Sequence, residues 1–158
     1  MANLEMDMTN NLDGVLGLTQ NTNLFFGEVK DIKGIIPDFS IFCRGLSGTN
    51  ADRVFQLAYE IRKPQVAIYV RSNVNDYLTA WEKMRCIYTY LVRNIPSGYL
   101  DCRCLQSEPQ NLGQDDKGRY LFTMTFECWK QDNQWILSDG YWDDTKFWFD
   151  EETWNDGV

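Results

Sequence analysis

The chain has 158 residues, of which 44% are apolar and 15% aromatic, and its formal charge at pH 7 is −8. It contains no histidine, which excludes Ser-His and Cys-His catalytic pairs and every histidine-ligated metal site. The negative charge argues against nucleic-acid binding through a basic face, and no apolar run approaches the ~20 residues that cross a bilayer. We therefore expect a protein that works by assembly with other proteins.

The first part of the chain predicts one helix and then extended structure. Apolar residues recur at helical spacing from residue 4 to residue 19, although Gly14 and Gly17 weaken this helix. The first residues of the chain carry acids where a secretory signal has a basic stretch, so we expect a protein that stays inside the cell. Residues 24–26 predict an irregular strand or a loop. Residues 38–44 alternate as a strand does and precede a turn or loop over 46–50.

The middle of the chain predicts two extended runs and a second helix. The runs cover residues 55–62 and 65–71 and flank Pro64, which lacks an amide donor and so predicts a strand start or a sheet edge. A helix then begins near residue 77 and stops before Pro96. Its expected apolar face is Tyr77, Trp81, Met84, Tyr88 and Leu91, widened by Leu78, Ala80, Ile87 and Val92.

Two further strands complete the predicted core. They cover residues 100–104 and 120–129, and a polar loop over 107–119 separates them, with a turn at 115–118. The order of helix, strands, helix and strands predicts an α+β fold in which two principal helices pack on one face of a mainly antiparallel β-sheet. We expect one α+β domain over residues 1–131 and an acidic, aromatic C-terminal extension over 132–158.

Several stretches in this order resemble a known family. They are PQVAIYVR at 64–71, a helix opening NDY at 75–77 and closing YTYL at 88–91, PQNLGQDDKGR at 109–119, and YLFTMTF at 120–126. The first helix followed by NLFFG at 23–27 fits the same pattern. Together they resemble the tail terminator proteins of long-tailed, siphophage-type bacteriophages, also known as phage minor capsid proteins. The resemblance covers roughly residues 5–130.

The resemblance implies a structural protein of the phage virion with no enzymatic activity and no cofactor. It implies a homo-oligomeric ring, a hexamer, at the head-proximal end of the tail tube, which ends tail polymerisation and joins the tail to the neck and head. Expected partners are the tail tube protein and a neck or head-completion protein. DNA would pass through the lumen without specific binding, no membrane would be involved, and assembly would take place in the host bacterial cytoplasm. A neck adaptor or head-completion protein of the same phage is the neighbouring alternative.

The extension after residue 132 lies outside the resemblance and has its own composition. Residues 139–158 hold seven acids and one base, hence −6 of the total charge of −8. Large aromatic side chains accompany them and predict a partner-binding arm, because such residues dominate interfaces. The alternative is that they complete this domain's own core or form a last hairpin. The candidate partner-binding residues are Tyr141, Trp142, Phe147, Trp148, Phe149 and Trp154.

Charged residues in the body suggest two further roles. Arg44 and Arg71 stand at strand ends and are candidates for ion pairs between subunits, or are ordinary surface arginines. Glu108, Asp115, Asp116 and the acids of the extension are candidates to line a lumen and repel DNA phosphate. A solvated acidic surface that promotes solubility explains the same acids equally well.

The residues leave three alternatives to assembly open. Cys102 and Cys104 lie on one side of a strand, as in a thiolate metal site, but no histidine can complete the shell, so reduced, buried thiols are expected for the five cysteines. The acids of the extension, Asp143, Asp144 and 150–152, would suit a carboxylate-only glycoside hydrolase if a rigid cleft held two of them. A ligand-binding or adaptor module would instead show a deep aromatic pocket.

Overall fold

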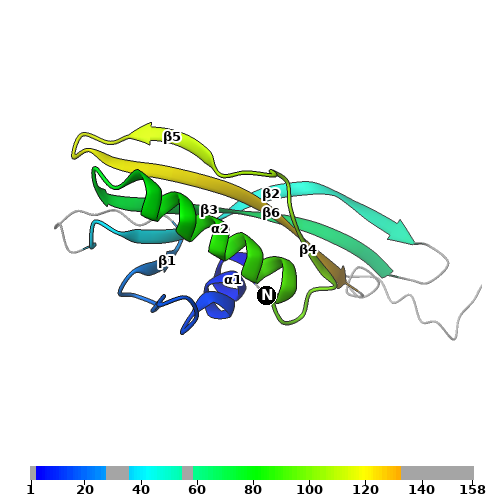
Figure 1. The fold of residues 1–158 in the computed structure, drawn as a ribbon. Helices are drawn as coiled ribbons and strands as arrows, with labels where there is room; N and C mark the ends of the chain where they lie inside the picture. The colour runs from blue at the N-terminus through cyan, green and yellow to red at the C-terminus, as the bar shows by residue number, and fades with distance from the viewer. Residues whose placement is uncertain (1–2, 28–35, 55–58, 133–158) are drawn as a thin grey trace, which may run out of the picture.

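The computed structural model of the chain describes residues 3–27, 36–54 and 59–132. These residues form two helices and six strands, and four of the five strand pairings are antiparallel. Strand order in the sheet is β1-β2-β3-β6-β4, with β5 also paired to β6; only β1 and β2 run parallel (Figure 1). The elements are α1 (Leu4–Leu12), β1 (Leu24–Phe26), β2 (Ser40–Val54), β3 (Tyr59–Val74), α2 (Tyr77–Arg93), β4 (Asp101–Cys104), β5 (Gln110–Gln114) and β6 (Arg119–Asp132).

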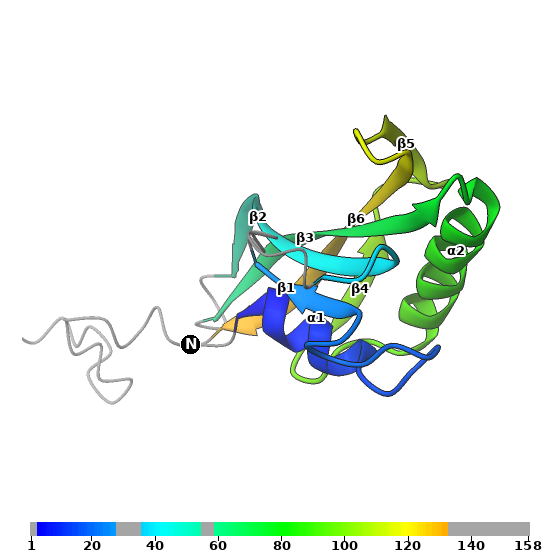
Figure 2. The ribbon, with the colours of Figure 1, turned by 90° about the vertical axis from the view of Figure 1, so that its left-hand side faces the viewer.

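Both helices pack on the same face of the sheet, which confirms the predicted α+β class (Figure 2). The core lies between this face and the helices. Val66, Ile68 and Val70 of β3 point into it and pair in register with Phe126, Met124 and Phe122 of β6, all fully or almost fully buried. The alternate side chains of β3 and β6 point to the opposite face of the sheet, which neither helix of the described residues covers; we call it the helix-free face.

The first helix is shorter than the sequence predicts. It begins at Leu4, where the Asn3 side chain accepts the backbone N–H of Glu5, and it ends at Leu12 instead of continuing to residue 19. Leu16 adopts a positive φ of 55°, and Gly14 and Gly17 adopt positive φ angles of 74° and 72°. A left-handed residue cannot continue a right-handed helix. The apolar residues after Leu12 therefore belong to a turn, and Leu18 still reaches the core.

The second helix buries a narrower stripe than predicted. Its fully buried residues are Ala80, Met84, Ile87 and Leu91. The remaining members of the predicted face divide into two groups. Trp81 and Tyr88 are half-buried against the core, whereas Tyr77, Leu78 and Val92 are exposed.

The first turn of α2 explains the exposure of Tyr77. The ring of Tyr77 meets the rings of Tyr120 and Phe122 edge-on, with centroids 5.2 Å and 5.0 Å away, and so lies across the end of the sheet. An aromatic residue at this position packs at the border of the core and stays partly in water. The smaller residues of α2 face the sheet directly.

Truncating one residue inside and one outside this stripe tests its position. We expect Ile87→Ala to lower the free energy of unfolding by about 2–5 kcal/mol, because it leaves a cavity in a closed core. Val92→Ala, one of the predicted apolar residues, should change it by less than about 0.5 kcal/mol because Val92 is 51% exposed. Urea unfolding of both variants measures the difference, and equal losses would contradict the assignment.

Strand β2 runs through the region where the sequence predicts a turn. Leu46 pairs with Gln65 and Thr49 with Lys63, so two residues of β2 face the single residue Pro64 of β3. This is a β-bulge, and it places Pro64 inside a central strand, not at the expected strand start or edge. The bulge accommodates a residue that has no N–H to donate to β2.

Gly48 makes this bulge possible. Its φ is +75°, and a Cβ at this position would lie 2.5 Å from the backbone oxygen of Lys63. A side chain would therefore both strain the backbone and collide with the neighbouring strand.

Alanine at two glycines separates these two effects. Gly14 has nearly the same φ, +74°, but nothing lies within 4 Å of a Cβ there. We expect Gly14→Ala to cost about 1–2 kcal/mol through the backbone alone. Gly48→Ala should cost roughly 1–3 kcal/mol more because of the collision. Thermal and urea unfolding compare the two variants, and equal costs would show that the bulge relaxes freely.

The remaining strands agree with the sequence except for β5. β4 and β6 confirm the strands predicted at 100–104 and 120–129, and β6 extends to Asp132. β5 lies inside the segment predicted as a polar loop, and all five of its residues are exposed, so it carries no apolar alternation. The predicted turn at 115–118 connects β5 to β6 and is closed by the hydrogen bond from Gly118 N to Asp115 O.

Candidate functional site

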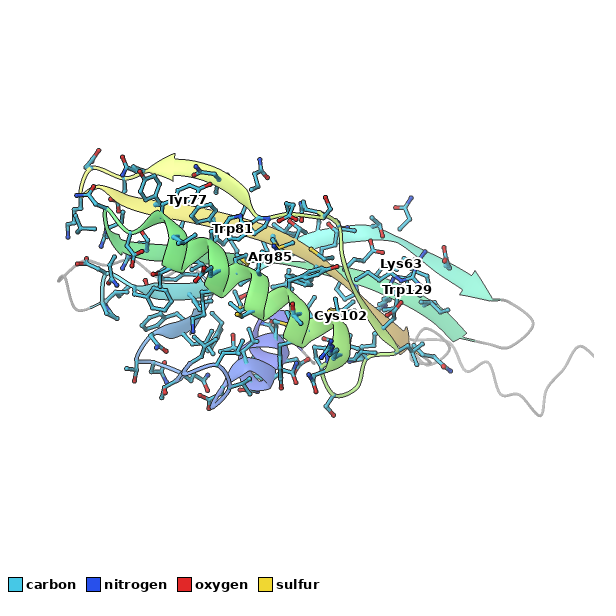
Figure 3. The ribbon with its side chains drawn as sticks, viewed as in Figure 1. Lys63, Tyr77, Trp81, Arg85, Cys102 and Trp129 are labelled. Carbon is cyan, nitrogen blue, oxygen red and sulfur yellow. The ribbon has the colours of Figure 1, made fainter. Side chains whose placement is uncertain are left out.

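The helix-free face of the sheet carries a cluster around the indole ring of Trp129. The Lys63 Nζ lies 4.9 Å and the Arg103 guanidinium carbon 4.2 Å from the centroid of this ring. Both distances are within the range of cation–π attraction. Figure 3 shows Lys63 beside Trp129, where β3 and β6 run together. We call Lys63, Arg103, Glu127 and Trp129 the Trp129 cluster.

Glu127 connects this cluster by hydrogen bonds. Its carboxylate accepts from Thr49 Oγ1, Gln65 Nε2 and Trp129 Nε1, each at 3.0 Å. Burial raises the pKa of Glu127, but these donors and Lys63 outweigh burial, so the pKa is lowered. The carboxylate therefore stays charged at neutral pH and holds three strands together on this face.

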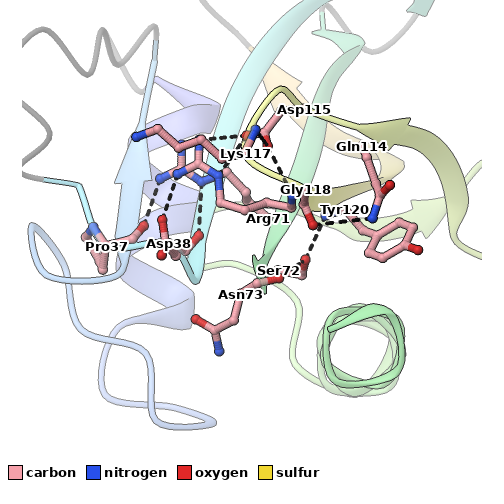
Figure 4. Close-up of polar contacts among 11 residues, drawn as sticks. Pro37, Asp38, Arg71, Ser72, Asn73, Gln114, Asp115, Lys117, Gly118 and Tyr120 are labelled. Carbon is pink, nitrogen blue, oxygen red and sulfur yellow. Dashed lines mark hydrogen bonds and ion pairs between the residues drawn. The ribbon is translucent and has the colours of Figure 1, made fainter. Parts of the chain in front are cut away.

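A second cluster joins the segment before β2 to the β5–β6 turn (Figure 4). The buried Arg119 donates from Nε to Asp115 Oδ2 at 2.7 Å and from Nη1 to Asp38 Oδ1 at 2.9 Å. The hydrogen bond from Arg119 is the largest cause that lowers the pKa of Asp115, and Asp115 in turn raises the pKa of Arg119. Arg71 donates to the backbone oxygens of Asp38 and Pro37.

The two edges of the sheet differ in how they are covered. β1 pairs only with residues 41–43 of β2, so β2 from Arg44 onward has no strand on its outer side within the described residues. Leu46, at 42% exposure, stands on this edge. On the opposite edge, β5 and β4 pair with successive parts of β6. The Glu5 side chain accepts the backbone N–H of Gly45 at 2.7 Å, so it covers the β2 edge at that residue. Beyond it, each edge can offer backbone groups to another chain, because an edge strand has unpaired N–H and C=O groups.

The cysteines form no metal-binding group. Cys102 Sγ lies 3.4 Å from Cys128 Sγ, whereas Cys104 lies near Gln106, and no three metal-ligating side chains converge within the described residues. Burial raises the pKa of Cys43 to about 12, so this thiol is protonated at neutral pH. The expectation of buried thiols is wrong for Cys86, which is exposed on α2.

The described part of the chain matches a known protein family. The model of the bacteriophage tail terminator protein family matches residues 8–132. The chain belongs to this family. A search of the curated proteins finds no match.

Family membership confirms the resemblance drawn from the sequence and makes this tail terminator a component of the phage virion. The family is one of tail structural proteins, which agrees with the expectation that the chain is not an enzyme. The match ends at Asp132, the last residue of β6 and the start of the acidic extension. No helix in the described part of the tail terminator is long and apolar enough to cross a membrane.

The predicted site residues of the tail terminator are spread over the described surface. Arg44 is exposed on the helix-free face, and Arg71 at the end of β3 uses its donors within the chain and lies over the Phe42 ring. Their roles between subunits stay predictions. The predicted partner-binding residues of the extension lie outside the described residues: Tyr141, Trp142, Phe147, Trp148, Phe149 and Trp154.

The predicted lumen acids do not form one group. Glu108 is exposed in the connection between β4 and β5, and Asp115 and Asp116 stand at the far end of β5, in the turn to β6. Asp115 is bound by Arg119, so part of its charge is compensated. The Trp129 cluster was not predicted, because it depends on a strand register that the sequence does not reveal; the alternation of Glu127 and Trp129 is the only local signal.

Replacing one carboxylate tests the Arg119 cluster. Asp115→Asn keeps an acceptor for the turn amides but removes the charge, and we expect a loss of about 1–2 kcal/mol in unfolding free energy at pH 7. The folded-state pKa of Asp115 is lowered, so this contribution is present above the unfolded pKa of ~3.9 and disappears as the pH falls through the folded pKa. Unfolding at pH 7 and at acid pH measures it. Asp116→Asn, at an exposed neighbour, should be neutral, and a loss independent of pH would contradict the charge interaction.

Proposed function

We propose that the tail terminator forms a homo-hexameric ring on the head-proximal end of the tail tube, ends its polymerisation and joins it to the neck. The observation that carries the proposal is the family match over residues 8–132, together with the edge of β2, which no strand of the described residues covers beyond residue 43. A ring needs two different complementary surfaces on each subunit, since a heterologous contact repeats around the axis until it closes. The number of six subunits is what the resemblance of the sequence to tail terminator proteins implies.

The two sheet edges supply such a pair of surfaces. β2 beyond residue 43 presents an open edge on one side of the subunit, and the exposed strand β5 presents one on the other. Backbone pairing between one subunit's β2 and the next subunit's β5 would extend the sheet from copy to copy. Subunits joined in this way satisfy the edge groups that would otherwise invite unrelated strands.

Termination follows from surface complementarity. One side of the ring matches the last ring of the tail tube protein, and the other side matches the neck or head-completion protein. A tube subunit that arrives at a capped end meets no copy of its own surface, so the tube stops growing. DNA crosses the lumen without specific binding, and exposed acids such as Glu108 and Asp116 help to repel its phosphates.

Tails assembled with and without the chain test this function. We expect electron micrographs to show a narrow distribution of tail lengths with the chain and overlong tubes without heads in its absence. Leu46→Lys, which places a charge on the open β2 edge, should leave the subunit folded but give the overlong phenotype. Leu78→Lys, at a 60% exposed residue of α2, is the matched control and should behave as wild type.

The outcomes separate the proposal from its neighbour. Tails of normal length that fail to join heads in the absence of the chain would indicate a neck adaptor and overturn termination. Normal assembly with Leu46→Lys would show that the β2 edge is not part of the ring contact. Circular dichroism of both lysine variants establishes that they are folded before the tails are compared.

A further inference from the structure

A shallow groove of about 400 Å³ lies between the C-terminal half of α2 and the turn that follows α1. Arg85, Cys86, Thr89, Tyr90 and Arg93 of α2 form one wall, and Leu16 contributes to the other. Lys83 Nζ donates to the backbone oxygen of Leu16 at 2.9 Å and so fixes the two walls relative to one another. No acidic residue lines the groove.

The two arginines of the groove lack acidic partners. Within the described residues, neither Arg85 nor Arg93 forms an ion pair, whereas Arg62, Arg103 and Arg119 each do. Arg85 lies over the ring of Trp81, with its guanidinium carbon 5.0 Å from the ring centroid (Figure 3). A chain of charge −8 thus keeps two arginines without an ion pair along one groove.

The extension has the composition that such a groove attracts. Residues 139–152 contain six acids and one base together with five aromatic residues. A guanidinium group binds a carboxylate through paired hydrogen bonds and also stacks on an aromatic ring. We propose that this acidic, aromatic segment docks into the Arg85–Arg93 groove of its own subunit.

The strand that precedes the extension contacts the loop that follows α2. Leu100 N donates to Trp129 O at 2.7 Å, and Lys130 Nζ lies 5.6 Å from the centroid of the Tyr99 ring. These contacts join Trp129 and Lys130, near the end of β6, to the loop that follows α2, whereas Figure 2 shows the end of β6 and helix α2 on opposite sides of α1. Docking on the same subunit therefore depends on whether the extension is long enough to reach the groove.

The length of the extension is sufficient. α2 has 17 residues and is about 26 Å long, and the groove occupies its second half. Residues 139–152 follow Asp132 by 7 to 20 residues, and each residue spans up to about 3.3–3.6 Å when extended. A tether of this length keeps the segment at an effective concentration in the millimolar range, above that of other copies in dilute solution. Docking would hold part of the extension on its own subunit and present the remaining aromatic residues in a defined position for partners.

A disulfide between the groove and the extension tests the proposal on the full chain. Cys86 is exposed in the groove, while Cys43, Cys102 and Cys128 are buried. Thr145→Cys adds a thiol at a position of the extension that is neither acidic nor aromatic. With oxidised glutathione, two thiols become one disulfide and two molecules of reduced glutathione form. We expect peptide mass spectrometry to find the link between residues 86 and 145 within monomeric chains.

Charge reversal in the groove is the decisive comparison. Arg85→Glu with Arg93→Glu in the Thr145→Cys chain should slow formation of the link about tenfold, and high salt should slow it in the unreversed chain. Arg44→Glu with Lys117→Glu makes the same charge change away from the groove and should leave the rate unchanged. Far-UV circular dichroism confirms that both double variants fold.

Each other outcome overturns the proposal. A chain with Cys86→Ser and Thr145→Cys is mixed with one that keeps Cys86 and Thr145; a link between these two chains as fast as the internal one would assign the segment to a neighbouring copy. No link at all would show that the segment does not visit the groove. A link that survives reversal of both arginines would show that charge complementarity does not direct it. These measurements use the purified chain, so they do not depend on tail assembly.

Discussion

Burial of one face of the sheet is the constraint on which the rest of the structure depends. Val66, Ile68 and Val70 of the central strand β3 meet Phe122 and its neighbours of β6 on the helix side. Because side chains alternate with period two, a slip of one residue would move this whole set into solvent. The register of β3 and β6 is therefore strongly determined, and every residue on the opposite face takes its place from it. Trp129 and Arg103 meet on that face because Cys128 and Cys102 meet on the other.

The helix-free face is kept in order by contacts between polar side chains and aromatic rings. A face without helices cannot bury large apolar side chains, yet it must remain ordered if it is to meet other subunits. Long cationic side chains lie over the aromatic rings, and Glu127 holds donors from three strands. Such contacts cover apolar ring area while charged ends stay in water. The result is a surface that is polar and yet well fixed, which suits contacts that form only during assembly.

The sequence predicts the helices and strands of this fold better than it predicts how they end and which strand each one pairs with. Period and breakers were enough to place α2 and β6, since a long amphipathic stripe or a long alternation leaves one interpretation. The same signals predict an α1 that is too long, because Leu16 and Leu18 continue the apolar spacing after the backbone has turned left-handed. They missed β5 because a strand with five exposed residues has no apolar pattern. Pro64 was misplaced for a different reason: the bulge that accepts it is supplied by Gly48, 16 residues earlier.

The Arg119 cluster likewise combines a contact between residues close in the sequence with one between residues far apart. The pairing of Asp115 with Arg119 spans four residues within one hairpin, whereas Asp38 joins them across 81 residues and depends on the finished sheet. The charge of the chain is divided in the same way, since the body to residue 138 carries only −2 and the extension carries −6. A nearly neutral body can approach its own copies without strong repulsion, while a concentrated negative segment would repel its equivalents in the proposed ring. In the proposed ring, six such segments would oppose closure unless each were held against positive charge, and Arg85 and Arg93 offer such charge on one groove.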